Sequence, residues 1–78
     1  MAQKITVYST QACPFCMRLK QFLKENNIDF ENIDISTNAE KTQEMVERSG
    51  QMGVPVIDID GKIIVGFDKD KITQALGL

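Results

Sequence analysis

Both cysteines of this 78-residue chain lie in one four-residue segment, Cys13-Pro14-Phe15-Cys16. Residues 4–8 before it are rich in β-branched and aromatic side chains, and an amphipathic helix pattern follows it. Proline suits the first position of a helix, because the N–H that it lacks would have no partner there. We therefore predict a strand over 4–8, a short loop, and a helix that begins at Pro14.

The two thiols are spaced so that they can close a disulfide across one helical turn. A helix N-terminus favours a negatively charged sulfur, which makes Cys13 the expected nucleophile and Cys16 the resolving thiol. Zinc is an alternative, but the segment supplies two ligands, and the chain has neither histidine nor a third cysteine. A structural disulfide would close too short a loop to remove much chain entropy. The segment therefore favours thiol–disulfide exchange and predicts no metal site.

The first helix and the strand after it are predicted from apolar spacing. The helix should end at Asn26-Asn27, and its inward face should consist of Phe15, Leu19, Phe22 and Leu23. A second strand is expected over 28–35. Its apolar alternation slips between Phe30 and Ile33, which allows a bulge or an early end.

The second helix should begin at a capping box formed by Thr37 and Glu40. It should run to about Ser49 and stop at Gly50, a residue type that commonly ends helices. The side chains expected to face inward are Met45, Val46 and Ser49.

The last part of the chain predicts a hairpin and a short helix. Strands over 56–59 and 62–65 flank the turn dipeptide Asp60-Gly61. Asp68 is a good N-cap for a helix with Ile72, Ala75 and Leu76 inward. The order β-α-β-α-β-β-α implies one α/β domain, 1–78, whose mixed sheet carries helices on both faces.

Charge and hydropathy exclude several kinds of partner. The net charge is −2 and no block of Lys and Arg occurs, so we expect neither nucleic acid nor a membrane surface as partner. No apolar run is long enough for a signal peptide or a membrane span. With its cysteines confined to one motif, the chain is expected to be cytoplasmic.

With these motifs the chain resembles a glutaredoxin, a small member of the thioredoxin superfamily. The resemblance rests on the strand–CPFC–helix segment, on Val54-Pro55 before the hairpin, and on Gly66-Phe67-Asp68 before the last helix. It implies the thioredoxin fold, with a four-stranded mixed sheet and three helices. It also implies a monomeric dithiol–disulfide oxidoreductase that uses glutathione as co-substrate, has no tightly bound cofactor, and reduces protein disulfides and glutathione mixed disulfides.

The resemblance also assigns a glutathione-binding groove. Val54 should pair its backbone with the substrate beside a cis Pro55, as an added strand does. The N–H groups of Phe67 and Asp68, after Gly66, should bind the γ-glutamyl carboxylate. Phe15 should form an aromatic wall. The residues by themselves equally allow Asp68 to be a helix cap and Phe15 a partly exposed apolar side chain, and favour a trans Pro55 that starts a strand.

Four positions depart from the glutaredoxin pattern: Thr10, Thr42, Val65 and Lys69. The first two stand where family members carry cationic or amide side chains for the glycine carboxylate of glutathione. A second interpretation is therefore an NrdH-type redoxin, reduced by thioredoxin reductase and donating electrons to ribonucleotide reductase. Gly66-Phe67 is similar to the Gly-Phe of those chains. A third is a module that binds a 2Fe–2S cluster, which needs four ligands and hence two protomers.

Overall fold

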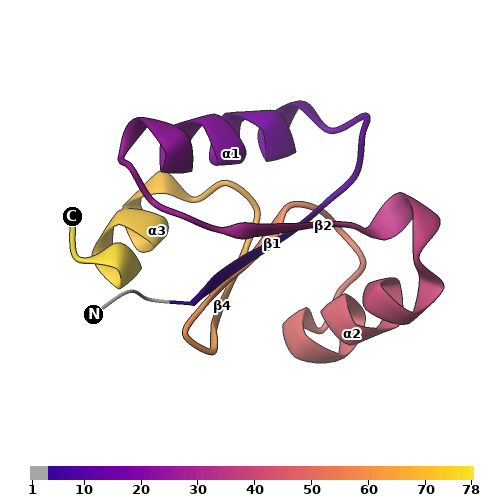
Figure 1. The fold of residues 1–78 in the computed structure, drawn as a ribbon. Coiled ribbons are helices and arrows are strands. Elements are labelled where there is room, and N and C mark those ends of the chain that lie inside the picture. Colours follow the sequence, from indigo (N-terminus) through magenta and orange to yellow (C-terminus); the bar gives the residue numbers. More distant parts are fainter. Residues whose placement is uncertain (1–3) are drawn as a thin grey trace.

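The computed structural model describes residues 4–78 and shows the predicted α/β architecture (Figure 1). Four strands and three α-helices follow one another in the expected order, with one short 3-10 helix, η1, inserted before α2. Their bounds are β1 Ile5–Ser9, α1 Pro14–Glu25, β2 Glu31–Asp34, η1 Ile35–Thr37, α2 Ala39–Ser49, β3 Val56–Ile59, β4 Lys62–Val65 and α3 Lys69–Leu76. The predicted mixed sheet with three helices is thus confirmed.

The strand order in the sheet is β2-β1-β3-β4. β1 runs parallel to β2 and antiparallel to β3, where Tyr8 lies opposite Val56. β3 runs antiparallel to β4, where Val56 lies opposite Val65. The end of β1, the start of β3 and the end of β4 therefore meet at one end of the sheet. The unit β1-α1-β2 joins two neighbouring parallel strands. After α2 the chain crosses to the other side of β1, where β3 runs antiparallel to it.

Helices cover both faces of the sheet. α1 and α3 lie on one face and α2 lies on the other (Figure 1). Alternate residues of a strand point to opposite faces, so Val7 joins the core under α1 and α3, while Tyr8 joins the core under α2. The first core contains Ile5, Val7, Leu19, Leu23, Ile57, Ile59, Ile64 and Ile72, and the second contains Tyr8, Ile35, Met45 and Val56.

The end of α1 shortens β2 relative to the prediction of 28–35. Asn27 adopts a left-handed backbone with φ of 58°, and the Ile28 N–H donates to the Leu23 carbonyl at 2.9 Å. Residue 28 therefore belongs to the turn that closes α1, as Asn26-Asn27 predicted, and pairing with β1 starts later. β1 itself also begins and ends one residue later than predicted, so Ser9 belongs to the strand rather than to the loop.

The predicted capping box of α2 is wrong. Thr37 belongs to η1, and the N-cap is Asn38, whose side-chain oxygen accepts the Lys41 N–H at 3.1 Å. The 3-10 turn that follows β2 uses residues 35–37, so the helix begins one residue later than the box requires. The predicted end is confirmed, because Gly50 caps α2 in the left-handed conformation with φ of 75°.

The hairpin and the last helix match their predictions. β3 and β4 have the predicted bounds, and both turn residues have positive φ, 50° for Asp60 and 93° for Gly61. Two positive φ values in succession are what a tight two-residue turn requires. Asp68 is the N-cap of α3, and Ile72 is fully buried on the inward face.

Candidate functional site

The three segments that the sequence singles out meet at one end of the sheet. The CPFC segment follows the end of β1, Val54-Pro55 precedes the start of β3, and Gly66 follows the end of β4. The Gly66 N–H donates to the Pro55 carbonyl at 2.8 Å, which ties the last two segments together. The peptide bond between Val54 and Pro55 is cis. Topology rather than sequence proximity therefore assembles this site.

The two cysteines share a hydrogen bond at the start of α1. Cys13 is the N-cap residue, and its Sγ accepts the backbone N–H of Cys16 at 3.2 Å. Pro14 occupies the first helical turn, as predicted. Both thiols are free; Cys13 retains 8% of its surface exposed and Cys16 none. An N–H donor and the helix dipole both favour an anionic Cys13 sulfur, which is also the sulfur that solvent reaches.

Cys16 lies in an environment that keeps its thiol protonated. Burial is the main cause that raises the pKa of Cys16 to about 11, and its hydrogen bond with Cys13 raises it further. The backbone of Thr10 and the positive charge of Lys20 act in the opposite direction. At neutral pH Cys16 is therefore a neutral thiol, which suits a group that reacts second rather than first.

Phe15 does not face the core, contrary to the predicted inward face of α1. Leu19 and Leu23 are fully buried, but Phe15 is 56% exposed. In the first turn of α1 the buried residue is Cys16 rather than Phe15. The guanidinium of Arg18 lies 5.5 Å from the centre of the Phe15 ring. This arrangement leaves the aromatic side chain on the surface beside Cys13.

Sequence reasoning missed further apolar side chains at this end of the molecule. Met17 is 64% exposed and Met52 is 66% exposed, and Val65 also reaches solvent. Met17 follows Cys16 directly, Met52 lies in the loop before Val54, and Val65 ends β4. The exposure of Met17 could have been predicted from the sequence, because Met17 does not fall at the helical spacing of the inward-facing residues of α1. Like Phe15, each of these three is a large apolar side chain exposed to solvent.

The start of α3 carries free backbone donors. The Asp68 carboxylate accepts the Lys71 N–H at 3.2 Å and so caps the helix, as predicted. The Phe67 ring packs against the Phe22 ring at the edge of the first core. Within residues 4–78, the backbone N–H groups of Phe67 and Asp68 have no acceptor. These two donors at a helix N-terminus can bind an anion.

The Thr42 hydroxyl is engaged with backbone carbonyls. It lies 2.9 Å from the Ile35 carbonyl and 3.0 Å from the Asn38 carbonyl. The side chain is therefore used inside the junction between η1 and α2. The backbone of Thr10 forms a hydrogen bond with Cys16, and the Thr10 side chain carries no charge.

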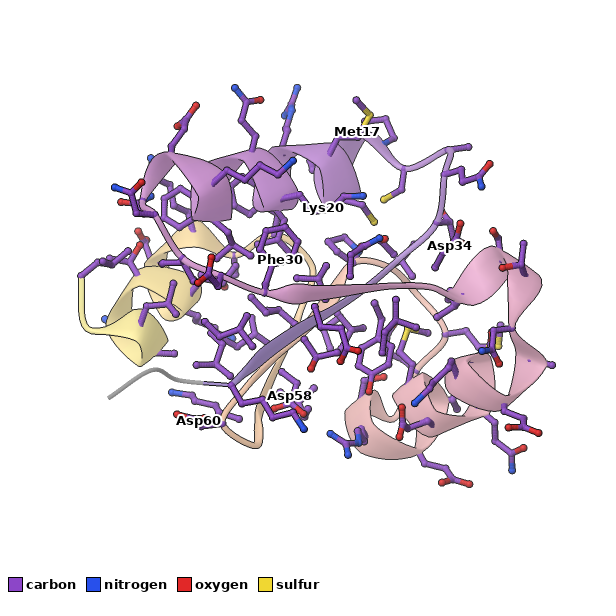
Figure 2. All side chains as sticks on the ribbon, in the orientation of Figure 1. Met17, Lys20, Phe30, Asp34, Asp58 and Asp60 are labelled. Atoms are coloured by element: carbon purple, nitrogen blue, oxygen red, sulfur yellow. The ribbon has the colours of Figure 1, made fainter. Side chains whose placement is uncertain are left out.

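A separate polar groove of about 420 Å³ lies on the α2 face of the sheet, and no thiol lines it. Along it the Tyr8 hydroxyl donates to Glu44 at 3.0 Å, and Arg48 pairs with Asp58. Burial, followed by the Glu44 carboxylate, raises the pKa of Tyr8 to about 12. In Figure 2, Asp58 lies on the other side of the sheet from Lys20 of α1. This groove is thus distinct from the cysteine site, and its charges largely neutralise one another.

Neither a candidate metal cluster nor a candidate membrane-spanning helix occurs within residues 4–78. No three His, Cys, Asp or Glu side chains gather there in a way that could hold a metal ion. None of the helices in that range has the length and apolar character needed to cross a membrane.

Comparison with known proteins gives consistent matches. A family model described as Glutaredoxin matches residues 5–64. The chain is 46% identical over 72 residues to an uncharacterized glutaredoxin-like 8.6 kDa protein in a rubredoxin operon of Clostridium pasteurianum, covering 92% of this chain and 96% of that protein. It is 39% identical over 64 residues to glutaredoxin 3 of Escherichia coli, covering 82% and 77%. A solved thioredoxin-like protein superposes with a TM-score of 0.90 at 34% identity, covering 95% of each chain.

Proposed function

This chain belongs to the glutaredoxin family, and from that premise we propose that it is a dithiol–disulfide oxidoreductase in which Cys13 attacks and Cys16 resolves. Its substrates are protein disulfides and glutathione mixed disulfides, and glutathione is its reductant. The observation that carries the proposal is the hydrogen bond from the Cys16 N–H to Cys13 Sγ at the start of α1.

The reaction follows from the different environments of the two thiols. The Cys13 thiolate attacks one sulfur of the substrate disulfide, and the other sulfur leaves as a thiolate. The resulting mixed disulfide at Cys13 is then opened in one of two ways. In the first, Cys16 attacks Cys13 Sγ, the Cys13–Cys16 disulfide forms, and the bound thiol is released. In the second, a glutathione thiolate attacks the substrate sulfur, Cys13 leaves as a thiolate, and a disulfide between glutathione and the substrate forms. The protonated, buried Cys16 does not compete with Cys13 for the first attack.

The proposed glutathione site uses mainly backbone groups. The free N–H groups of Phe67 and Asp68, after Gly66, bind the γ-glutamyl carboxylate at the start of α3. Val54, beside Pro55, pairs its backbone with the cysteinyl part of the tripeptide. Phe15 contributes an exposed aromatic surface next to Cys13. These contacts do not depend on side-chain charge.

A second candidate is an NrdH-type redoxin that takes electrons from thioredoxin reductase and passes them to ribonucleotide reductase. Two observations favour it. Thr42 is engaged with backbone carbonyls and Thr10 is uncharged, so neither supplies a cation for the glycine carboxylate of glutathione. A lost charge-assisted hydrogen bond costs about 1.5–3 kcal/mol of binding.

One experiment separates these two candidates. The oxidised protein is mixed with glutathione in one arm, and with thioredoxin reductase and NADPH in the other, and reduction is followed by thiol titration. Faster reduction by glutathione supports the first candidate. Reduction by thioredoxin reductase, with no reduction by glutathione, would contradict the first candidate and support the second.

The proposal extends to the domain organisation, oligomeric state and cofactor content of the protein. We propose one domain over residues 1–78 that acts as a cytoplasmic monomer without a tightly bound cofactor. The alternative of a 2Fe–2S module predicts visible cluster absorbance in freshly purified protein, together with dimers, since a cluster takes four ligands. A colourless monomer contradicts that alternative.

A further inference from the structure

The resolving step requires a buried thiol to lose its proton. Cys16 is fully buried, and burial is the first cause of its raised pKa of about 11. Only a small fraction of such a thiol is ionised at neutral pH, and the thiolate is the form that attacks. The rate of resolution therefore depends on groups that stabilise the Cys16 anion.

Lys20 is placed to provide that stabilisation. It follows Cys16 by four residues in α1, so the two side chains lie one turn apart on the same helix face. Lys20 is partly buried, whereas Lys24, one turn further along, is exposed. In Figure 2 the Lys20 side chain lies on the sheet side of α1 and extends toward the end of the helix that carries Met17. Its positive charge favours the Cys16 thiolate, against the effect of burial.

Asp34 acts on the same lysine from the sheet. Its carboxylate, at the end of β2, accepts the Ser36 N–H at 2.9 Å. Hydrogen bonds from Ser36 lower the pKa of Asp34, with smaller contributions from Gln11 and from the charge of Lys20. Asp34 is therefore an anion at neutral pH, and its charge interaction with Lys20 is the last of these contributions. The ionisable groups that face Lys20 and Cys16 are thus Asp34 from β2 and Cys13 from the loop before α1.

We propose that Lys20 is a positioning residue for resolution, whose ammonium group stabilises the Cys16 thiolate as it attacks the mixed disulfide. In this step the Cys16 proton passes to solvent, and the Cys16 sulfur forms a bond to Cys13 Sγ. The bond between Cys13 and the client sulfur breaks, and the client leaves as a thiolate that takes up a proton. Cys16 is oxidised and the client sulfur is reduced. The inference rests on the proposed dithiol function.

Dithiodipyridine, a neutral aromatic disulfide, resolves the two steps in a stopped-flow experiment. Attack by Cys13 releases one equivalent of thiopyridone, and resolution by Cys16 releases the second. In Lys20→Met, each unit by which the pKa of Cys16 rises reduces its thiolate tenfold, and greater intrinsic nucleophilicity partly offsets this. We therefore expect the second phase to slow about threefold per unit. The pH at which that phase reaches half its maximal rate should move upward, while the first phase changes little.

Two further variants make the result specific. Lys24→Met removes an equal charge at an exposed position one turn further from Cys16 on the same helix, and it should leave both phases unchanged. Lys20→Arg should restore the second phase. An unchanged pH midpoint in Lys20→Met, or equal slowing of both phases, would overturn the role of Lys20. Release of a single equivalent by the unmodified protein would instead overturn the dithiol function itself, so the two failures are distinguishable.

Discussion

The ring of Phe67 packs against the ring of Phe22, with centroids 5.9 Å apart and an interplanar angle of 58°. The contact joins the segment before α3 to the C-terminal third of α1, and the Lys69 ammonium group lies 5.7 Å from the same Phe22 ring. Phe67 also carries one of the two free N–H groups at the start of α3. The packing of its ring therefore helps to set where the proposed anion-binding donors lie relative to the helix that carries the cysteines.

Replacing Phe67 with alanine should affect both stability and binding. Fully buried Phe→Ala changes cost about 3–5 kcal/mol, and Phe67 is only partly buried, so we expect a loss of about 1–3 kcal/mol. Glutathione affinity should fall together with stability, because the donors at α3 lose their support. Urea unfolding and calorimetric titration measure the two effects. Leu78→Ala, at an exposed position, is the control and should change stability by less than about 0.5 kcal/mol. Unchanged stability in Phe67→Ala would contradict the packing argument.

The two cysteines should not be equivalent in activity. Cys13→Ser should abolish all disulfide reductase activity, because a hydroxyl is not ionised at neutral pH and cannot replace the thiolate. Cys16→Ser should keep part of the activity toward a glutathionylated peptide, because that route needs only Cys13 and a second glutathione. The coupled oxidation of NADPH through glutathione reductase measures both. Full activity in Cys13→Ser would remove the proposed mechanism, and an inactive Cys16→Ser would remove the monothiol route.

The reduced protein should lose stability as the pH rises above 9. The pKa of Cys16 is raised from 9.0 to about 11 and that of Tyr8 from 10.0 to about 12. The unfolded chain therefore releases these protons at lower pH than the folded chain, and ionisation pulls the equilibrium toward unfolding. We expect the free energy of unfolding to be about 1–2 kcal/mol lower at pH 10 than at pH 8.

Urea unfolding at several pH values under reducing conditions measures this dependence. Cys16→Ala and Tyr8→Phe each remove one of the groups, so each should flatten the decline even if it lowers stability at pH 8. A decline that is equally steep in both variants would assign the effect to other groups.

The observed cap of α2 predicts which polar residue matters for that helix. Asn38→Ala should destabilise the protein by about 0.5–2 kcal/mol, because the Lys41 N–H loses its acceptor. Thr37→Ala, one residue earlier, should change stability by less than about 0.5 kcal/mol, because Thr37 is exposed and is not the cap. Thermal unfolding of the two variants compares them directly. A larger effect at Thr37 than at Asn38 would favour the capping box over the observed cap.

Elements whose signals lie within a few residues were predictable. Pro14 starts α1, Gly50 ends α2, Asp60-Gly61 forms the hairpin turn, and Asp68 caps α3. Each of these depends on the conformational preference or hydrogen bonding of one short stretch. The prediction at Thr37 failed because the start of α2 does not depend on local residues alone. The 3-10 turn before α2 depends on where β2 stops pairing with β1, which is distant in the sequence.

The order of elements, the position of both thiols at a helix start and the segments that could surround them all followed from the amino-acid sequence alone. Tertiary packing was needed to place Phe15 on the surface while Cys16 is buried. The same packing sets the contact between the Phe67 and Phe22 rings, and it lets the Lys20 charge act on both Cys16 and Asp34. These features depend on strands and helices that meet from distant parts of the chain. Burial, which sets the protonation of the resolving thiol, exists only after those elements have packed together.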